Sequence, residues 1–96
     1  MLIKKFFNIA GTITMIPNGY NITIKSYNTT KDVYVYWYKP DNIEVINISG
    51  DYDENGTNGN TYWFKFNVVN PNEIKSISIT TNTTTIKGLA IGIDPK

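Results

Sequence analysis

The stretch VYVYWYKP at residues 33–40 alternates valine or tryptophan with tyrosine until it reaches a proline. Successive side chains of a β-strand point to opposite faces, so this alternation predicts a strand with two different sides. We expect Val33, Val35 and Trp37 to face a hydrophobic core. The tyrosines between them then form a second row, which faces outward and needs an explanation of its own.

Similar short segments recur along the chain, separated by turns rich in Asn, Gly and Pro. Period-two patterns of apolar residues bounded by such turns are typical of strands. Adjacent Val45 and Ile46 leave the register of one segment ambiguous and predict a bulge. In another, the inward face is expected to carry Tyr62, Phe64, Phe66 and Val68. The expected strands span 2–7, 11–16, 20–26, 33–40, 43–49, 61–69, 73–80 and 85–93, and residues 50–60 are expected to form a long loop.

This series of strands without a helical pattern predicts an all-β domain. Seven or eight strands with turns about every ten residues match an antiparallel β-sandwich or a small barrel, and of the two we expect the sandwich. The whole chain, residues 1–96, is expected to form a single domain, because a second core would leave both halves too small to fold.

The tryptophan of the opening stretch favours one type of sandwich over another. Trp37 followed by Tyr38, Lys39 and Pro40 resembles the third strand of immunoglobulin-like domains. That resemblance implies a tryptophan buried between the two sheets. The cysteine pair of those domains is missing here, so only the architecture carries over. An eight-stranded jelly roll is the alternative.

Composition argues against several classes of function. A net charge of +1 with no arginine disfavours a nucleic-acid partner. With neither cysteine nor histidine, the chain lacks disulfides, thiol nucleophiles and the commonest general base. Asp51, Asp53 and Glu54 share one segment with no visible partner to separate their pKa values, so we expect no enzyme. No segment approaches the roughly 20 apolar residues of a spanning helix, so no membrane span is expected.

The outward tyrosine row is the sharpest functional signal. If Tyr34, Tyr36 and Tyr38 face outward beside Trp63, they form a contiguous aromatic patch. Such patches mark protein interfaces or flat ligand platforms. Aromatic faces also stack on sugar rings, as in carbohydrate-binding modules. The alternative is an ordinary strand surface, because tyrosine has high strand propensity and its hydroxyl is stable in water.

The segment DYDENGT at residues 51–57 is similar to the first half of an EF-hand calcium loop. Oxygens at alternate positions followed by a glycine suit a hard cation. The metal ligands predicted on this basis are Asp51, Asp53, Asn55 and Thr57. Tyr62 occupies the position where the motif needs a glutamate, so a solvated hairpin loop is the alternative.

Five Asn-x-Ser/Thr sequons begin at Asn21, Asn28, Asn47, Asn55 and Asn82. They are acceptors for glycosylation in a compartment that contains the enzymes. In a chain this rich in Asn and Thr, some arise by chance.

These observations predict a non-enzymatic structural protein without a cofactor. We expect a small β-sandwich that packs against copies of itself or a larger protein assembly. A virion accessory or decoration protein, or a subunit of a cell-surface layer, fits this description, and the expected location is an extracellular surface or a virion. The alternative is a carbohydrate-binding module whose aromatic platform contacts glycans, with calcium held by the Asp51 segment.

Overall fold

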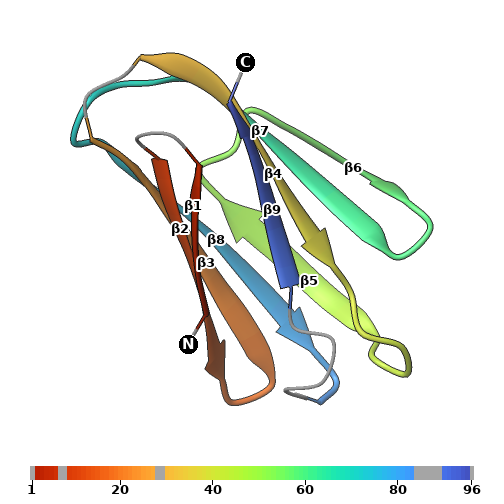
Figure 1. Cartoon of the computed structure of the whole chain (residues 1–96). Coiled ribbons are helices and arrows are strands. Elements are labelled where there is room, and N and C mark those ends of the chain that lie inside the picture. Colours follow the sequence, from red (N-terminus) through yellow and green to blue (C-terminus); the bar gives the residue numbers. More distant parts are fainter. Residues whose placement is uncertain (1, 7–8, 28–29, 84–89, 96) are drawn as a thin grey trace.

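The computed structural model describes residues 2–6, 9–27, 30–83 and 90–95. These residues form nine strands and no helix, arranged in two antiparallel sheets that pack face to face (Figure 1). The predicted β-sandwich is therefore confirmed. Sheet A consists, in spatial order, of β1 (Leu2–Phe6), β2 (Ile9–Ile16), β3 (Gly19–Ser26), β8 (Ile74–Thr81) and β5 (Val45–Gly50). Sheet B consists of β6 (Glu54–Asn58), β7 (Thr61–Val69), β4 (Lys31–Tyr38) and β9 (Ala90–Pro95).

Six of the nine strands have the spatial order of an immunoglobulin-like sandwich. The neighbours β2, β3, β8 and β5 occupy the positions of strands A, B, E and D, and the pair β4 and β9 occupies those of C and F. The hairpin of β6 and β7 lies on the other side of β4 and follows β5 in the chain. The strand that carries the tryptophan therefore lies inside sheet B and is paired on both sides.

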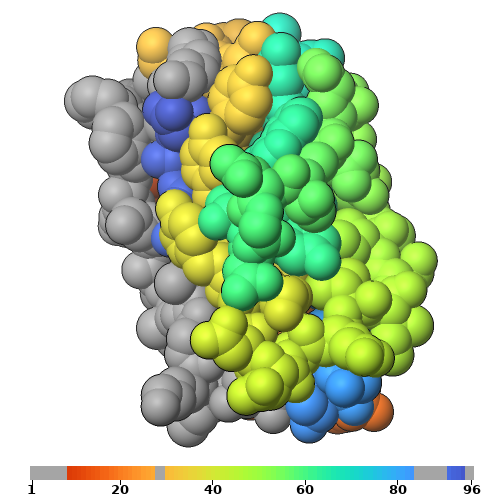
Figure 2. Space-filling view, turned by 90° about the vertical axis from the view of Figure 1, so that its right-hand side faces the viewer, coloured from red at the N-terminus to blue at the C-terminus, as the bar shows by residue number. Residues whose placement is uncertain are grey.

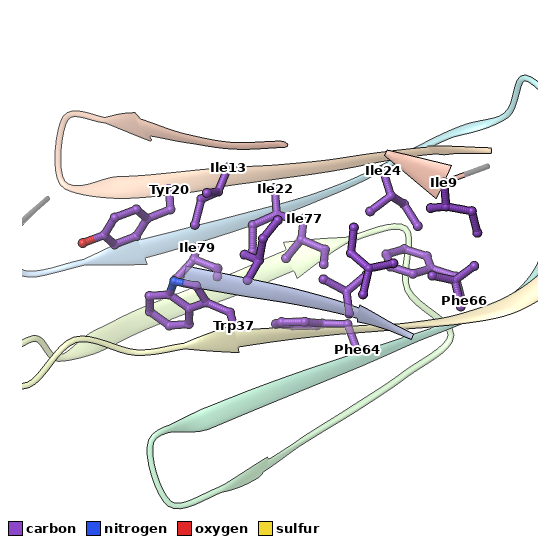
Figure 3. Packing of buried hydrophobic residues seen from close by; sticks show 14 of the residues in the cluster. Ile9, Ile13, Tyr20, Ile22, Ile24, Trp37, Phe64, Phe66, Ile77 and Ile79 are labelled. Atoms are coloured by element: carbon purple, nitrogen blue, oxygen red, sulfur yellow. The ribbon is translucent and has the colours of Figure 1, made fainter. Parts of the chain in front are cut away.

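Trp37 is fully buried between the two sheets (Figure 3). Its ring lies 5.4 Å from that of Tyr20 in sheet A and 5.4 Å from that of Tyr62 on the neighbouring strand. Its indole Nε1 has no hydrogen-bond partner among the described residues. Trp37 thus contributes to the core by packing. The buried apolar residues are Ile9, Ile13, Tyr20, Ile22, Ile24, Val33, Val35, Trp37, Ile43, Phe64, Phe66, Val69, Ile77, Ile79, Ile91 and Ile93.

Gly11 allows the two sheets to approach each other at one side of the sandwich. A Cβ atom at this position of β2 would overlap the side chain of Ile93 and touch that of Ile91, both on β9. The two isoleucines therefore fill the space that a side chain at position 11 would occupy. The core thus extends to this side of the sandwich.

Two expectations about individual segments are wrong. Residues 50–60 are not a long loop, because Glu54–Asn58 form β6 and pair with β7. Val68 does not face the core. It is exposed, and Val69 takes the buried position. The predicted bulge beside Val45 is confirmed by a register shift in the pairing of β5 with β8. The expected beginning of the last strand, residues 85–89, lies outside the described residues, and β9 begins at Ala90.

The reversal at Val68 has a backbone cause. The pairing of β4 with β7 shifts register between Lys31 and Val33, and Val68 adopts a φ of 54°. The Val68 N–H donates to Oδ1 of Asp32 over 2.8 Å. A side-chain carboxylate thus replaces a backbone acceptor at the irregularity. A β-branched residue at positive φ is strained.

Trp37→Ala should lower the free energy of unfolding by about 3 to 5 kcal/mol, because it leaves a large cavity between the sheets. Chemical denaturation followed by far-UV circular dichroism measures this loss. Trp63→Ala, the same deletion on the outside of sheet B, should cost clearly less. A loss below about 1 kcal/mol for Trp37→Ala would contradict its place in the core.

Val68→Gly should raise the free energy of unfolding by about 0.5 to 1 kcal/mol, because glycine relieves the strain of a positive φ at a modest entropic cost. The same denaturation experiment measures the gain. Val69→Gly serves as the control and should destabilise the domain, because the neighbouring valine is buried. Equal losses for both variants would argue against the left-handed backbone at Val68.

Candidate functional site: the aromatic face of sheet B

The pairing of β4 with β7 brings the four predicted aromatic residues together. Tyr36 lies directly opposite Trp63, Tyr34 opposite Lys65 and Tyr38 opposite Thr61. Because Val33, Val35 and Trp37 are buried, the residues between them point to the outside of the sandwich. We call the side chains of Tyr34, Tyr36, Tyr38 and Trp63 the aromatic face.

Three of the four rings of the aromatic face contact one another, with Tyr34 between Tyr36 and Trp63. Tyr34 stacks on Tyr36 with ring centres 6.4 Å apart and planes 13° from parallel. Tyr34 also lies 6.4 Å from Trp63 in a tilted arrangement. These contacts leave Tyr34, Tyr36 and Trp63 half-buried, whereas Tyr38 is 43% exposed. Figure 2 views the molecule from this side, with β4, β7 and β6 next to one another.

Two glycines on the flanking strands leave room for the rings to lie close against the surface of the sheet. Gly56 of β6 pairs with Trp63, and a Cβ atom on it would lie 2.7 Å from the indole. Gly92 of β9 pairs with Tyr36, and a Cβ there would lie 2.9 Å from the Tyr38 hydroxyl. One cross-strand row therefore reads glycine, tryptophan, tyrosine, glycine. The sequence alone does not reveal this role of the two glycines, because it depends on how the strands pair.

A charged row runs beside this aromatic row. Glu54, Lys65, Tyr34 and Asp94 lie next to one another on β6, β7, β4 and β9. The Lys65 ammonium lies 5.6 Å from the centre of the Tyr34 ring and 3.5 Å from the Glu54 carboxylate. The interaction with Tyr34 is the largest cause that raises the pKa of Lys65, and Glu54 adds to it, while desolvation opposes both. Lys65 is therefore a stable cation at the rim of the rings.

Two of the four predicted metal ligands, Asp51 and Asp53, lie on the connection between the two sheets. The Asp51 N–H donates to the Ser76 carbonyl over 2.9 Å, and Oδ2 of Asp51 accepts from the Ser76 N–H over 3.0 Å. The Asp53 N–H donates to the Lys65 carbonyl over 2.8 Å, and Oδ2 of Asp53 accepts from the Asn67 N–H over 2.7 Å. Asp51 thus extends the ladder of sheet A, and Asp53 that of sheet B.

The other two predicted ligands, Asn55 and Thr57, belong to β6. Gly56 between them is paired with Trp63, so the sharp turn of a calcium loop is not formed at this glycine. Within the described part of the chain, no three acidic side chains form a cluster that suits a metal ion. The pairing of Gly56 thus removes the loop geometry on which calcium binding by Asp51, Asp53, Asn55 and Thr57 was predicted, and calcium titration tests that prediction directly.

The outer face of sheet A contains a polar hollow that the sequence did not suggest. Its volume is about 240 Å³. It lies over β3, β8 and β5 and is lined by Asn21, Thr23, Ser49, Gly50, Asp51, Ser76, Ile77 and Ser78. The lining contains no aromatic ring, so the hollow differs in chemistry from the aromatic face.

Four of the five sequons have described asparagines, and all four are exposed: Asn21, Asn47, Asn55 and Asn82. Asn28 lies outside the described residues. Asn21 and Asn47 belong to strands of sheet A, whereas the sequon at Asn55 lies on β6 and includes Gly56, which pairs with Trp63. Glycans at Asn21 and Asn47 would leave the aromatic face uncovered, and one at Asn55 would lie beside it.

Comparison with known proteins gives no family assignment. No protein-family model matches the chain, and no solved structure matches it significantly. Among the described residues, no helix is both long enough and apolar enough to cross a membrane.

Asp51→Ala and Asp53→Ala should each lower the free energy of unfolding by about 1 kcal/mol, because each leaves a backbone N–H without its carboxylate acceptor. Asp51→Asn keeps an acceptor oxygen and should cost less. The exposed Glu44→Ala is the control and should change stability by no more than about 0.5 kcal/mol.

Millimolar calcium should leave the melting temperature unchanged, because backbone N–H groups already occupy one oxygen of each carboxylate. Differential scanning calorimetry with and without calcium tests this expectation. A rise in melting temperature that disappears in Asp53→Ala would instead support the calcium site.

Proposed function

We propose that this domain is a non-enzymatic structural module that joins a larger protein assembly through the aromatic face of sheet B. Such a module suits an accessory or decoration protein of a virion, or a subunit of a cell-surface layer, and therefore an extracellular surface. The observation that carries the proposal is the direct pairing of Trp63 with Tyr36 on the outer side of the sheet, between Gly56 and Gly92.

The chemistry of the rings supports an interface. Tyrosine and tryptophan are enriched in protein interfaces and dominate their energetic centres. Each ring contributes a large contact area and has few rotatable bonds, so little conformational entropy is lost on binding. The mutual contacts of Tyr34, Tyr36 and Trp63 already hold these rings in place before a partner arrives. Such preorganisation increases affinity.

The charged row supports a defined orientation of the partner. Lys65 is held between the aromatic rings and Glu54, and Asp94 lies at the far end of the same row. Charges at the rim of an interface contribute more to specificity and association rate than to affinity. A partner surface with the complementary order of charges would therefore dock in one register.

Glycan binding is the second candidate, and one observation favours it. Gly56 and Gly92 allow the rings to lie low on the sheet, and hydrogen-bonding groups on Glu54 and Lys65 lie beside them. Flat rings beside polar groups also suit the stacking of a sugar. The calcium site that the sequence suggested for this candidate is not supported by a loop turn at Gly56, so glycan binding depends on the rings and the charged groups beside them.

Measurement of mass in solution separates the two candidates. Sedimentation velocity should show an oligomer for the unmodified chain, and Tyr36→Ser should weaken association about thirtyfold, the effect of losing an interface residue worth roughly 2 kcal/mol. Tyr27→Ser is the matched control, because Tyr27 is a 48% exposed tyrosine outside the aromatic face, next to the end of β3. The control should associate like the unmodified chain.

A monomer that polysaccharide retards in an affinity gel, with the retardation lost in Tyr36→Ser, would support glycan binding instead. A monomer that is not retarded, and that enters its native particle or surface layer equally well with and without Tyr36→Ser, would contradict both candidates.

A further inference from the structure

We propose that β5 is an acceptor edge at which a partner protein adds an extended segment with an apolar centre and lysine or arginine flanks. This inference concerns a surface separate from the aromatic face and does not depend on the function proposed for that face. Addition of a strand to a sheet edge is a common mode of recognition, in which main-chain hydrogen bonds contribute affinity.

The edge strands of the two sheets differ in how well they are covered and protected. β1 of sheet A lies beside β9 of sheet B, so one side of the sandwich is closed more tightly than the side formed by β5 and β6 (Figure 1). β6 reads ENGTN, and all of its residues except Thr57 have low strand propensity. β5 reads VINISG and contains neither the lysine nor the proline with which proteins commonly protect an edge. β5 is therefore the edge best suited to accept another strand.

The direction of the backbone groups of β5 follows from one hydrogen bond. The Asp51 N–H donates to the Ser76 carbonyl on β8. Backbone groups of an antiparallel strand alternate between its two sides, so the N–H and C=O groups of Ile48 and Gly50 point away from β8. No other described strand lies on that side of β5, because β5 ends the sheet. These groups form an open ladder.

Apolar side chains lie beside the open backbone groups of β5. Ile46 is 65% exposed, the largest value among the exposed large apolar residues of the described chain. It lies at the bulge between Val45 and Asn47. Val45 and Ile48 pack against the core and are only partly buried, because the sandwich ends beside them. An added strand would cover all three.

The charge around β5 identifies the type of partner. β5 itself contains no charged residue, and the Lys39 ammonium near its beginning donates to the Pro40 and Ile43 carbonyls. Glu44 and Asp51 flank β5, so antiparallel pairing of two copies about Ile48, whose backbone groups point outward, would bring Glu44 of each copy close to Asp51 of the other. Like charges directly opposite one another are destabilising. The edge therefore disfavours self-pairing and favours a segment with basic flanks.

The test uses the full chain labelled with ¹⁵N and two synthetic peptides, KKTVTVKK and EETVTVEE. The first peptide should slow hydrogen exchange of the Ile48 and Gly50 amides and shift their resonances, because these amides gain acceptors. The second peptide should leave both unchanged. The lysine-flanked peptide should also lose affinity as salt is added.

Matched substitutions test whether the lysine-flanked peptide binds at β5. Ile46→Lys and Glu44→Lys should each weaken binding of the lysine-flanked peptide about threefold to tenfold, because each adds positive charge to the edge. Ile74→Lys is the control, since Ile74 is a 57% exposed isoleucine that lies beyond the part of β8 that pairs with β5. Ile74→Lys should bind like the unmodified chain. Tyr36→Ser should also leave peptide binding unchanged, which separates this inference from the role of the aromatic face.

Three outcomes would overturn the inference: no added protection at Ile48 and Gly50, equal binding of both peptides, or equal weakening by Ile46→Lys and Ile74→Lys. A dimer whose added protection falls on β5 would also overturn it, because the occupant would then be a second copy.

Discussion

The period-two alternation of β4 is the constraint on which the rest of the structure depends. Trp37 fills the space between the sheets, and burial of such a large ring fixes which side of β4 faces inward. β4 is paired with β7 on one side and β9 on the other, so its register cannot slip without disrupting two ladders. The outward position of Tyr34, Tyr36 and Tyr38 is therefore a direct consequence of the packing of the core.

The sequence predicts strands and faces well where hydrophobic burial decides them. The alternation in β4 and the phenylalanines of β7 were sufficient for the sandwich and for the outward aromatic row. β6 was missed because ENGTN has low strand propensity and is held by its pairing with β7. Val68 was placed on the wrong face because the register shift opposite Asp32 depends on two strands distant in sequence. Gly56 and Gly92 acquire their role only from the strands beside them.

Asp51 and Asp53 show how one pattern of residues supports two different structures. Acidic residues at alternate positions followed by a glycine are typical of a calcium loop, and here they occur where the chain crosses from sheet A to sheet B. At such a crossing the ladders of both sheets are interrupted, and carboxylate oxygens accept the N–H groups of Ser76 and Asn67. The sequence does not distinguish these uses, because the partners of the two carboxylates lie on other strands.

The burial of one tryptophan and the outward position of the other have a practical consequence. Trp37 lies in an apolar interior, and Trp63 lies at the surface over a glycine. Their indoles are natural fluorophores in different surroundings, so an aqueous quencher such as iodide should reach the second far more readily than the first. Fluorescence of the unlabelled chain therefore reports separately on unfolding, through Trp37, and on occupation of the outer side of sheet B, through Trp63.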